Sequence, residues 1–254
     1  MDRSPPHLRL QGKRAIVTGA SSGIGAATAL MLARAGARTL MVGRDEQRLS
    51  EAAAAAGRAG APCETVVADV TADGAPARIV EAAVERFGGI DAIVHSAGIF
   101  RMAAIAVADV ADLDLLYATN VRAPYLLTQA ALPHVPPGGS IVMMGSNLTV
   151  VAKSGMAAYS ASKAAVAVMA RSLAVELGES GVRINVVAPG IVRTPMVDAI
   201  TEDADLSARE ISATALGRLA DADDVAETIL FLASDASRHV TGATFVVDGG
   251  ESVR

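Results

Sequence analysis

The chain has 254 residues, of which 52% are hydrophobic and 19% charged, with a formal net charge of -5 and a pI near 5.4. This length suits one large α/β domain or two small ones around an aliphatic core. The charges are mixed in sign, which argues against nucleic-acid and membrane-surface partners. Cys63 is the only cysteine, so an intrachain disulfide is excluded. Because no stretch resembles a signal peptide or a membrane span, and the histidines are scattered, we expect a soluble cytoplasmic protein without a metal site.

The first predicted elements form a strand, a glycine-rich turn and a helix, over 15–18, 19–25 and 26–35. In this order, glycines permit a tight turn, a close approach of backbone to a pyrophosphate, and packing of helix on strand. The amino end of the helix also offers free N–H groups to an anion. We interpret the turn as a dinucleotide-binding site, whose contacts come from Gly19, Ser21, Ser22, Gly23, Ile24 and Gly25.

The second predicted strand, over 39–42, ends at Gly43-Arg44-Asp45, where a dinucleotide fold reads the adenosine ribose. Arginine pairs with a 2'-phosphate, whereas an acidic residue accepts from a 2'-hydroxyl. Arg44 therefore favours NADP(H) as cofactor. NAD(H) is the alternative if Asp45 is the ribose ligand, and Asp45 is also a preferred residue type for capping the next predicted helix, over 45–56.

Strands and helices continue to alternate, with strands predicted over 64–68 and 91–95 and a helix over 75–87 between them. This alternation predicts one Rossmann-type domain over 1–254, a doubly wound parallel sheet of about seven strands with helices on both faces. The residues that follow these two strands are expected to contact the cofactor: Asp69, Val70, Ala97 and Gly98.

Two polar residues stand out in their predicted elements. His95 ends the strand over 91–95, and we interpret it as a hydrogen-bonded packing residue. Asn120 falls inside a long helix predicted over 110–132, where asparagine is unfavourable unless its amide is used. Either Asn120 bonds a preceding carbonyl and bends the helix, or it holds a water near the active site.

A hydroxyl, a phenol and an ammonium are predicted to converge in the middle of the chain. Ser146 follows a buried strand over 141–144, at the edge where open α/β sheets bind ligands. Tyr159 and Lys163 are four residues apart and share one face of a helix predicted over 159–177. This trio suits proton transfer at an oxygen, because a nearby ammonium stabilises a phenolate and a serine hydroxyl can donate to the same oxygen.

The last part of the chain adds strands over 183–188 and 244–247 and a helix over 224–232. The stretch 191–220 is predicted to be irregular. A long connection at the carboxyl edge of a sheet is typical of a binding loop or lid, so we expect this stretch to contribute to substrate binding.

The complete set of motifs resembles the classical short-chain dehydrogenase/reductase family over almost the whole chain. The family's Thr-Gly-x-x-x-Gly-x-Gly motif matches 18–25, and its Ser and Tyr-x-x-x-Lys signature matches Ser146, Tyr159 and Lys163. The family's asparagine in the preceding long helix corresponds to Asn120. The resemblance implies transfer of hydride between a nicotinamide cofactor and a carbonyl or secondary alcohol.

The resemblance also implies residue roles. Tyr159 would be the general acid in reduction and the general base in oxidation. Lys163 would lower the pKa of Tyr159 and bind the nicotinamide ribose, and Ser146 would polarise the carbonyl. Asn120 would anchor a water in the proton relay. Beyond Tyr159 and Lys163, the implied cofactor contacts continue at Pro189, Gly190, Ile191, Val192 and Thr194.

The expected substrate is a mostly apolar ketone or alcohol of medium size. The alternative is a 3-oxoacyl group on acyl-carrier protein, but the chain has Leu126 and Val175 where arginines that dock an acidic carrier are expected, with only Arg122 and Arg171 nearby. The residues predicted to line the substrate site are Ser146, Leu148, Val150, Val151, Met156 and Met196.

One departure from the family pattern is His95-Ser96, which replaces the first two residues of Asn-Asn-Ala-Gly. Some proteins of this fold are non-catalytic dinucleotide sensors or structural partners, but these typically lose the tyrosine or the lysine, and this chain keeps both. By resemblance, the helices over 110–132 and 159–177 are expected to form a homodimer or homotetramer.

Overall fold

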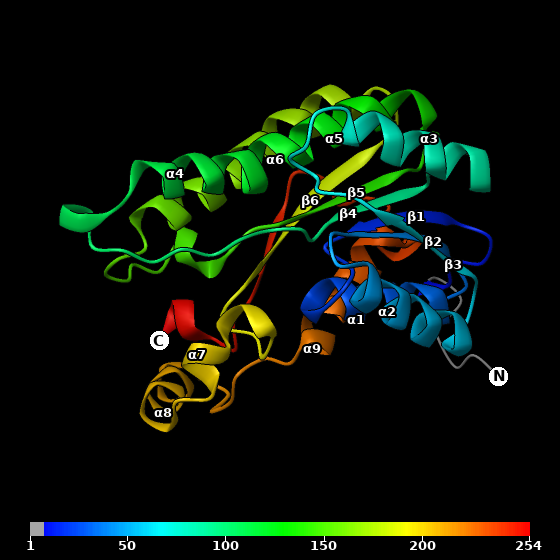
Figure 1. Cartoon of the computed structure of the whole chain (residues 1–254). Helices are drawn as coiled ribbons and strands as arrows, with labels where there is room; N and C mark the ends of the chain where they lie inside the picture. Colours follow the sequence, from blue (N-terminus) through cyan, green and yellow to red (C-terminus); the bar gives the residue numbers. More distant parts are fainter. Residues whose placement is uncertain (1–7) are drawn as a thin grey trace.

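The computed structural model describes residues 8–254, which form three layers around one parallel sheet (Figure 1). The strand order is β3-β2-β1-β4-β5-β6-β7. The sheet is wound outward from its centre in both directions, as predicted, because β1 pairs with β2 on one side and with β4 on the other. The strands are β1 (Arg14–Thr18), β2 (Arg38–Gly43), β3 (Cys63–Val67), β4 (Ala92–His95), β5 (Ser140–Met144), β6 (Arg183–Pro189) and β7 (Thr244–Val247).

Helices cover both faces of the sheet (Figure 1). One face carries α1 (Gly23–Arg34), α2 (Glu46–Ala59) and α9 (Ala222–Ala233). The other carries α3 (Ala75–Phe87), α4 (Val110–Tyr117), α5 (Ala123–Ala131) and α6 (Ala157–Gly178). Two further helices, α7 (Asp198–Thr201) and α8 (Ala204–Ala213), lie beyond the carboxyl edge of the sheet, near the C-terminus (Figure 1).

Short 3-10 helices connect these elements. They are η2 (Ile105–Val107), η4 (Leu132–His134), η5 (Asn147–Thr149), η6 (Pro195–Val197), η7 (Asp235–Ser237) and η8 (Glu251–Val253). Among the residues that the structure describes, no helix is both long and apolar enough to cross a membrane.

The hydrophobic core consists of two clusters, one on each face of the sheet. Adjacent strand residues belong to different clusters: Val17 and Met41 pack with α1 and α9, whereas Ile16 and Leu40 pack with α3 and α6. Because successive side chains of a strand point to opposite faces, continuous apolar strands are buried on both sides. The aliphatic runs in the sequence therefore produce a sheet whose two faces are covered, which leaves the ends of the strands open to ligands.

The long helix predicted over 110–132 is interrupted. A π-helical turn, η3 (Ala118–Arg122), separates α4 from α5 and contains the buried Asn120. The Asn120 amide does not bond a preceding carbonyl of its own helix. Its Oδ1 accepts from the N–H of Ile99 at 3.0 Å, and its Nδ2 donates to the carbonyl of Ile99 and to Oγ of Ser162, each at 3.1 Å. The alternative that Asn120 bonds a preceding carbonyl of its own helix was therefore wrong, because its amide binds the loop after β4, which is distant in sequence.

The stretch 191–220 is less irregular than predicted, since it contains η6, α7 and α8. Asp203 caps α8 by accepting from the backbone N–H groups of Asp205 and Leu206, and so helps to start a helix within this stretch. Helix α2 also extends past Gly57 and ends at Gly60, where a side chain would collide with the carbonyl of Ala33.

Candidate active site

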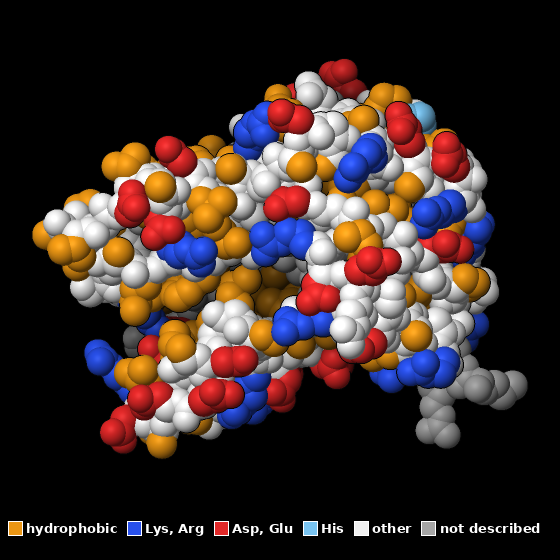
Figure 2. Space-filling view, in the orientation of Figure 1, with side chains coloured by type: hydrophobic (Ala, Val, Ile, Leu, Met, Phe, Trp, Pro, Cys, Tyr) orange, Lys and Arg blue, Asp and Glu red, His pale blue; other side chains and the backbone are white. Residues whose placement is uncertain are grey.

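A cleft runs along the carboxyl ends of β1, β2, β4, β5 and β6 and has a volume of about 490 Å³. Figure 2 shows its mouth as a hollow lined with hydrophobic side chains. Every residue predicted to contact the cofactor lines this cleft, from the glycine-rich turn to Thr194. Ser146, Tyr159 and Lys163 line it as well, so one cavity holds both groups of predicted residues.

The glycine-rich turn forms a cradle in which side chains cannot fit. A Cβ on Gly19 would lie 2.7 Å from the backbone nitrogen of Ala97, and one on Gly25 would lie 2.2 Å from the carbonyl oxygen of Gly19. Thr18 Oγ1 accepts from the same Ala97 nitrogen at 3.1 Å, which ties the ends of β1 and β4 together. Ser22 precedes α1 without capping it through its side chain. The first-turn N–H groups are thus available to an anion, and the cradle fits a dinucleotide pyrophosphate.

The end of β2 presents Arg44 rather than Asp45 to the cleft. Asp45 accepts from the backbone N–H of Arg48 at 3.0 Å and caps α2, whereas Arg44 lines the cleft with 71% of its side chain exposed. Asp69 lies across from it, 3.7 Å from the guanidinium. Hydrogen bonds from Thr71, together with Arg44, outweigh burial and lower the pKa of Asp69. A cationic side chain therefore stands at the predicted ribose position.

Tyr159 and Lys163 project from the first turns of α6 towards the end of β5. The Lys163 ammonium donates to the carbonyl of Met144 at 2.9 Å and lies 5.7 Å from the centre of the Tyr159 ring. The edge of that ring packs against Phe100, with 5.1 Å between ring centres. Ser146 is buried, and its Oγ accepts from the N–H of Leu148 at 3.2 Å. The hydroxyl, phenol and ammonium therefore meet at one wall of the cleft.

Asn120 lies behind this wall and does not itself line the cleft. Its bonds to Ile99 and Ser162 join the loop after β4 to α6, directly beneath Gly98. A Cβ on Gly98 would lie 3.3 Å from Asn120 Oδ1 and 3.6 Å from the Lys163 ammonium. In the structure, Asn120 thus fixes the backbone that the cofactor would pass.

The substrate end of the cleft includes only some of the residues predicted for it. Leu148, Met156 and Met196 line it together with Ser146, but Val150 and Val151 do not, and 66% of Val150 is exposed to solvent. After Ser146 the chain turns through η5, which directs Leu148 inward and carries the two valines away from the cavity.

Comparisons with known proteins agree with this arrangement. The sequence model of a family described as enoyl-(acyl carrier protein) reductase matches residues 19–252. The chain is 36% identical to the 3-oxoacyl-(acyl-carrier-protein) reductase of Thermotoga maritima, over 96% of this chain and 99% of that protein. It is 40% identical to the cis-4-hydroxycyclohexanecarboxylate dehydrogenase of Sinomonas cyclohexanicum, over 93% of this chain and 95% of that protein. This chain belongs to the classical short-chain dehydrogenase/reductase family.

Solved structures give the same result. A short-chain dehydrogenase from Burkholderia cenocepacia in complex with NADP superposes with a TM-score of 0.91, at 36% identity, covering 96% of this chain and all of that one (100%). A dehydrogenase/reductase from Sinorhizobium meliloti superposes with a TM-score of 0.92, at 36% identity, covering 96% of this chain and 97% of that one. The predicted family and fold are confirmed. The protein is an oxidoreductase that uses a nicotinamide dinucleotide and acts on CH–OH or C=O groups.

In this short-chain dehydrogenase/reductase, burial governs the protonation of the two central groups. Burial raises the pKa of Tyr159 to about 12, against a hydrogen bond from Ser146 that acts to lower it. Burial also lowers the pKa of Lys163 to about 8. The lowering of the tyrosine pKa by Lys163 stays a prediction, because the shift of Tyr159 in this structure comes from burial.

The sequence analysis missed several residues of the cleft. Phe100 packs on Tyr159, and Lys153 and Glu210 form an ion pair at the substrate end. A signal existed for Lys153, since it is the one charged residue between Ser146 and Tyr159. No sequence signal pointed to Glu210, because its contact with Lys153 depends on where α8 packs in the folded chain. The other missed apolar residues of the cleft wall include Ile99, Leu115, Val197 and Ile200.

His95, which departs from the family pattern, is a buried packing residue, as predicted. Its Nε2 is 2.9 Å from Oγ1 of Thr128, so it joins β4 to α5. Burial lowers the pKa of His95 to about 3. The imidazole is therefore neutral near neutral pH and takes no part in the cleft.

Proposed function

We propose that this protein transfers hydride between NADP(H) and the carbonyl or secondary alcohol carbon of a mostly apolar substrate. The observation that carries the proposal is that Ser146, Tyr159 and Lys163 share one cavity with the glycine cradle of β1 and α1. A dinucleotide bound in the cradle would supply the hydride in reduction and accept it in oxidation. The side chains at the other end handle the proton.

Tyr159 is the proposed general acid and base. In reduction its phenol donates the proton to the developing alkoxide, and in oxidation its phenolate removes the proton of the alcohol. Ser146 donates to the same oxygen and holds it in place. The packing of Phe100 against Tyr159 excludes water from one side of the phenol. Lys163 provides positive charge near the phenol, which favours the phenolate. Asn120 is proposed to anchor a water of the proton relay, as the family resemblance implies.

NADP(H) is the proposed cofactor, with NAD(H) as the alternative. Arg44 is exposed in the cleft and its guanidinium can pair with a 2'-phosphate, while Asp45 is used as the cap of α2. The related structure from Burkholderia cenocepacia, which contains NADP, is consistent with this choice.

Reduction of 3-oxoacyl groups on acyl-carrier protein is the second candidate. It is favoured by the match to the Thermotoga maritima reductase over almost its whole length. The surface offers less support, since Val175 is 81% exposed where a basic residue would dock an acidic carrier. We therefore favour a free ketone or alcohol.

A homodimer or homotetramer is the proposed assembly. Tyr125 on α5 and Val168 and Val175 on α6 are exposed, at 45%, 53% and 81%, and form part of the face that the sequence predicts as the dimer interface. The cytoplasm is the proposed compartment, because the partly buried Cys63 is a free thiol.

The test is oxidation of NADPH and NADH, followed in parallel by absorbance, with cyclic, aliphatic and 3-oxoacyl ketones. We expect turnover of at least one ketone with NADPH preferred, and a loss of about a hundredfold or more in kcat for Tyr159→Phe, which cannot transfer the proton. The Tyr125→Phe variant, which removes a phenol outside the cleft, is the matched control. A strong preference for NADH would contradict the assignment of Arg44, and full activity of Tyr159→Phe would contradict that of Tyr159.

A further inference from the structure

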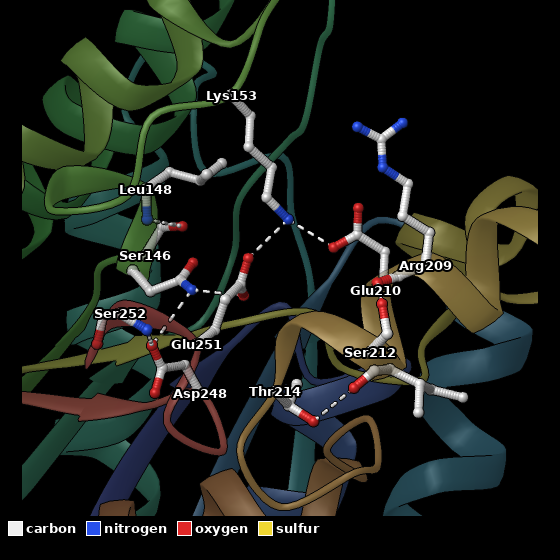
Figure 3. A network of polar contacts seen from close by, with 12 residues as sticks. Ser146, Leu148, Lys153, Arg209, Glu210, Ser212, Thr214, Asp248, Glu251 and Ser252 are labelled. Carbon is white, nitrogen blue, oxygen red and sulfur yellow. Dashed lines mark hydrogen bonds and ion pairs between the residues drawn. The ribbon is translucent and has the colours of Figure 1, made fainter. Parts of the chain in front are cut away.

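A cluster of charged side chains closes the substrate end of the cleft and joins three segments distant in sequence (Figure 3). Lys153 comes from the loop between β5 and α6, Glu210 from α8 and Glu251 from η8. The Lys153 ammonium lies 2.5 Å from a carboxylate oxygen of Glu210 and 2.8 Å from one of Glu251. Lys153 and Glu210 line the cleft, while Glu251 lies behind them with 7% of its side chain exposed.

A third carboxylate lies behind the first two. The Asn147 amide donates to Glu251 at 2.8 Å and to Asp248 at 3.4 Å. Asp248 is buried, and burial acts to raise its pKa, but hydrogen bonds from Ser252, Gly250 and Asn147 outweigh this effect and lower the pKa. Asp248 is therefore ionised near neutral pH. The carboxylates of Glu210 and Glu251 share one ammonium, and Asp248 shares the Asn147 amide with Glu251, so the cluster carries an excess of negative charge.

The Lys153 ammonium is held in its charged form by these partners. Burial acts to lower the pKa of Lys153, but the hydrogen bonds to Glu210 and Glu251 outweigh it and raise the pKa. The ammonium has three donor hydrogens, and two carboxylates already accept from it. It is therefore not a free cation for a substrate.

The other cations near the cleft do not pair with these carboxylates: Arg44 faces Asp69 at the cofactor end, and Arg254 donates to the carbonyls of Ser212 and Thr214 at the end of α8. Arg101 lines the cleft but is paired with Asp112 at 3.1 Å. Lys163 lies deeper and donates to the carbonyl of Met144. Arg209, next to Glu210, is exposed, and no ion pair joins it to the carboxylates in Figure 3. The wall between the cluster and Tyr159 is mostly apolar, with Leu148, Met156 and Ile200 among its residues.

We propose that this cluster makes the enzyme select uncharged substrates, with Glu210 as the specificity-determining residue. The inference rests on the proposed function, since it concerns the part of a ketone or alcohol remote from the reacting carbon. A carboxylate there would either take the third hydrogen of Lys153 or displace Glu210 from it, and in both cases would lie beside the carboxylates of the cluster. Like charges brought together in a partly desolvated site repel strongly, so an anionic substrate is disfavoured whereas a neutral polar group is accepted.

The experiment compares two ketones that differ only in charge: a cyclohexanone with a carboxamide opposite the carbonyl, and the same ketone with a carboxylate. In the wild-type enzyme kcat/KM is expected to be about tenfold or more higher for the carboxamide. Glu210→Gln removes one negative charge from the wall with little change in shape. It should reduce this ratio by about tenfold, mainly through a lower KM for the carboxylate.

Further variants separate charge from structure. Lys153→Arg keeps the cation and should keep the carboxamide-to-carboxylate ratio of kcat/KM. Lys153→Met leaves the carboxylates of Glu210 and Glu251 without their cation and should raise this ratio. Glu202→Gln removes a carboxylate near the end of α7, outside the cleft, and should change neither the ratio nor the activity. Because the kcat/KM of the two ketones is compared within each variant, a general loss of stability lowers both values and does not change their ratio.

The proposal would be overturned if the wild-type enzyme reduced the carboxylate ketone as well as the carboxamide ketone and Lys153→Met no longer reduced the carboxylate. Lys153 would then be a carboxylate receptor. If the protein binds NADPH but reduces no ketone, the proposed function fails independently. The charge inference is then tested by measuring, with NADPH present, how much each compound shifts the Tm of the wild type and of Glu210→Gln. If the carboxylate shifts the Tm of both proteins equally, the inference is overturned.

Discussion

At the scale of single residues, the buried ammonium of Lys163 opposes folding although it is central to the site. Its side chain is 5% exposed, and burial lowers its pKa from 10.5 to about 8. Such a shift corresponds to about 3 kcal/mol of unfavourable free energy for the charged form. The bond to the Met144 carbonyl offsets about 1 kcal/mol of this. A lysine at this position therefore lowers stability, as expected if the proposed chemistry requires it there.

Lys163→Met should therefore raise the free energy of unfolding near neutral pH by about 1–2 kcal/mol. Because the folded-state pKa of the lysine is lowered, the unfolded chain binds more protons between about pH 8 and 10.5, and wild-type stability rises with pH in this window. The advantage of the variant is thus constant below about pH 8 and shrinks above it. Urea unfolding at several pH values measures this, with Lys163→Arg, which keeps the charge, as control. A variant less stable than wild type at neutral pH would refute the argument.

At the scale of elements, the β1–turn–α1 unit depends on glycine for contact between backbone segments. A Cβ on Gly25 would lie 2.2 Å from the Gly19 carbonyl oxygen, and backbone cannot move away as a side chain would. By contrast, a Cβ on Gly57, inside α2, would meet nothing closer than 4.0 Å. The two glycines both lie inside helices but serve different purposes.

Gly25→Ala should displace α1 from the turn and weaken NADPH binding by about tenfold or more, because the first-turn N–H groups lose their alignment. Gly57→Ala should leave NADPH binding unchanged and raise the free energy of unfolding by about 0.5–1 kcal/mol, since glycine is unfavourable inside a helix. Titration calorimetry and urea unfolding measure the two effects. Normal NADPH affinity in Gly25→Ala would show that the cradle tolerates a methyl group.

At the scale of the whole molecule, an apolar face on the α4–α6 layer is exposed in the single chain. Val168 and Val175 are seven residues apart, so they lie on one face of α6, and they are 53% and 81% exposed. Exposed apolar patches of this kind mark sites of association between proteins.

Val168→Glu should convert the proposed dimer or tetramer into a smaller species, because a carboxylate would be buried in an apolar interface. Light scattering after size-exclusion chromatography measures the mass. Ala77→Glu, which places the same charge on the exposed surface of α3, is the control and should keep the wild-type mass. An unchanged mass for Val168→Glu would exclude this face as the main interface.

The sequence by itself determined the order of strands and helices, the glycine cradle and the pairing of Tyr159 with Lys163, because these depend on local periodicity and on spacings of a few residues. The doubly wound sheet followed from the alternation of elements. Local signals could not show that η3 breaks the helix at Asn120, because the partner of its amide, Ile99, lies 21 residues away.

The tertiary structure alone decided the substrate end of the cleft. It carried Val150 and Val151 out of the cavity and brought Glu210 to Lys153 across 57 residues of sequence. It also buried Lys163 and partly buried Tyr159, which shifts their pKa values in opposite directions. The physical reason is that burial and electrostatic pairing depend on which surfaces meet when α7, α8 and the C-terminal residues pack in the folded chain, and spacing along the chain does not specify this.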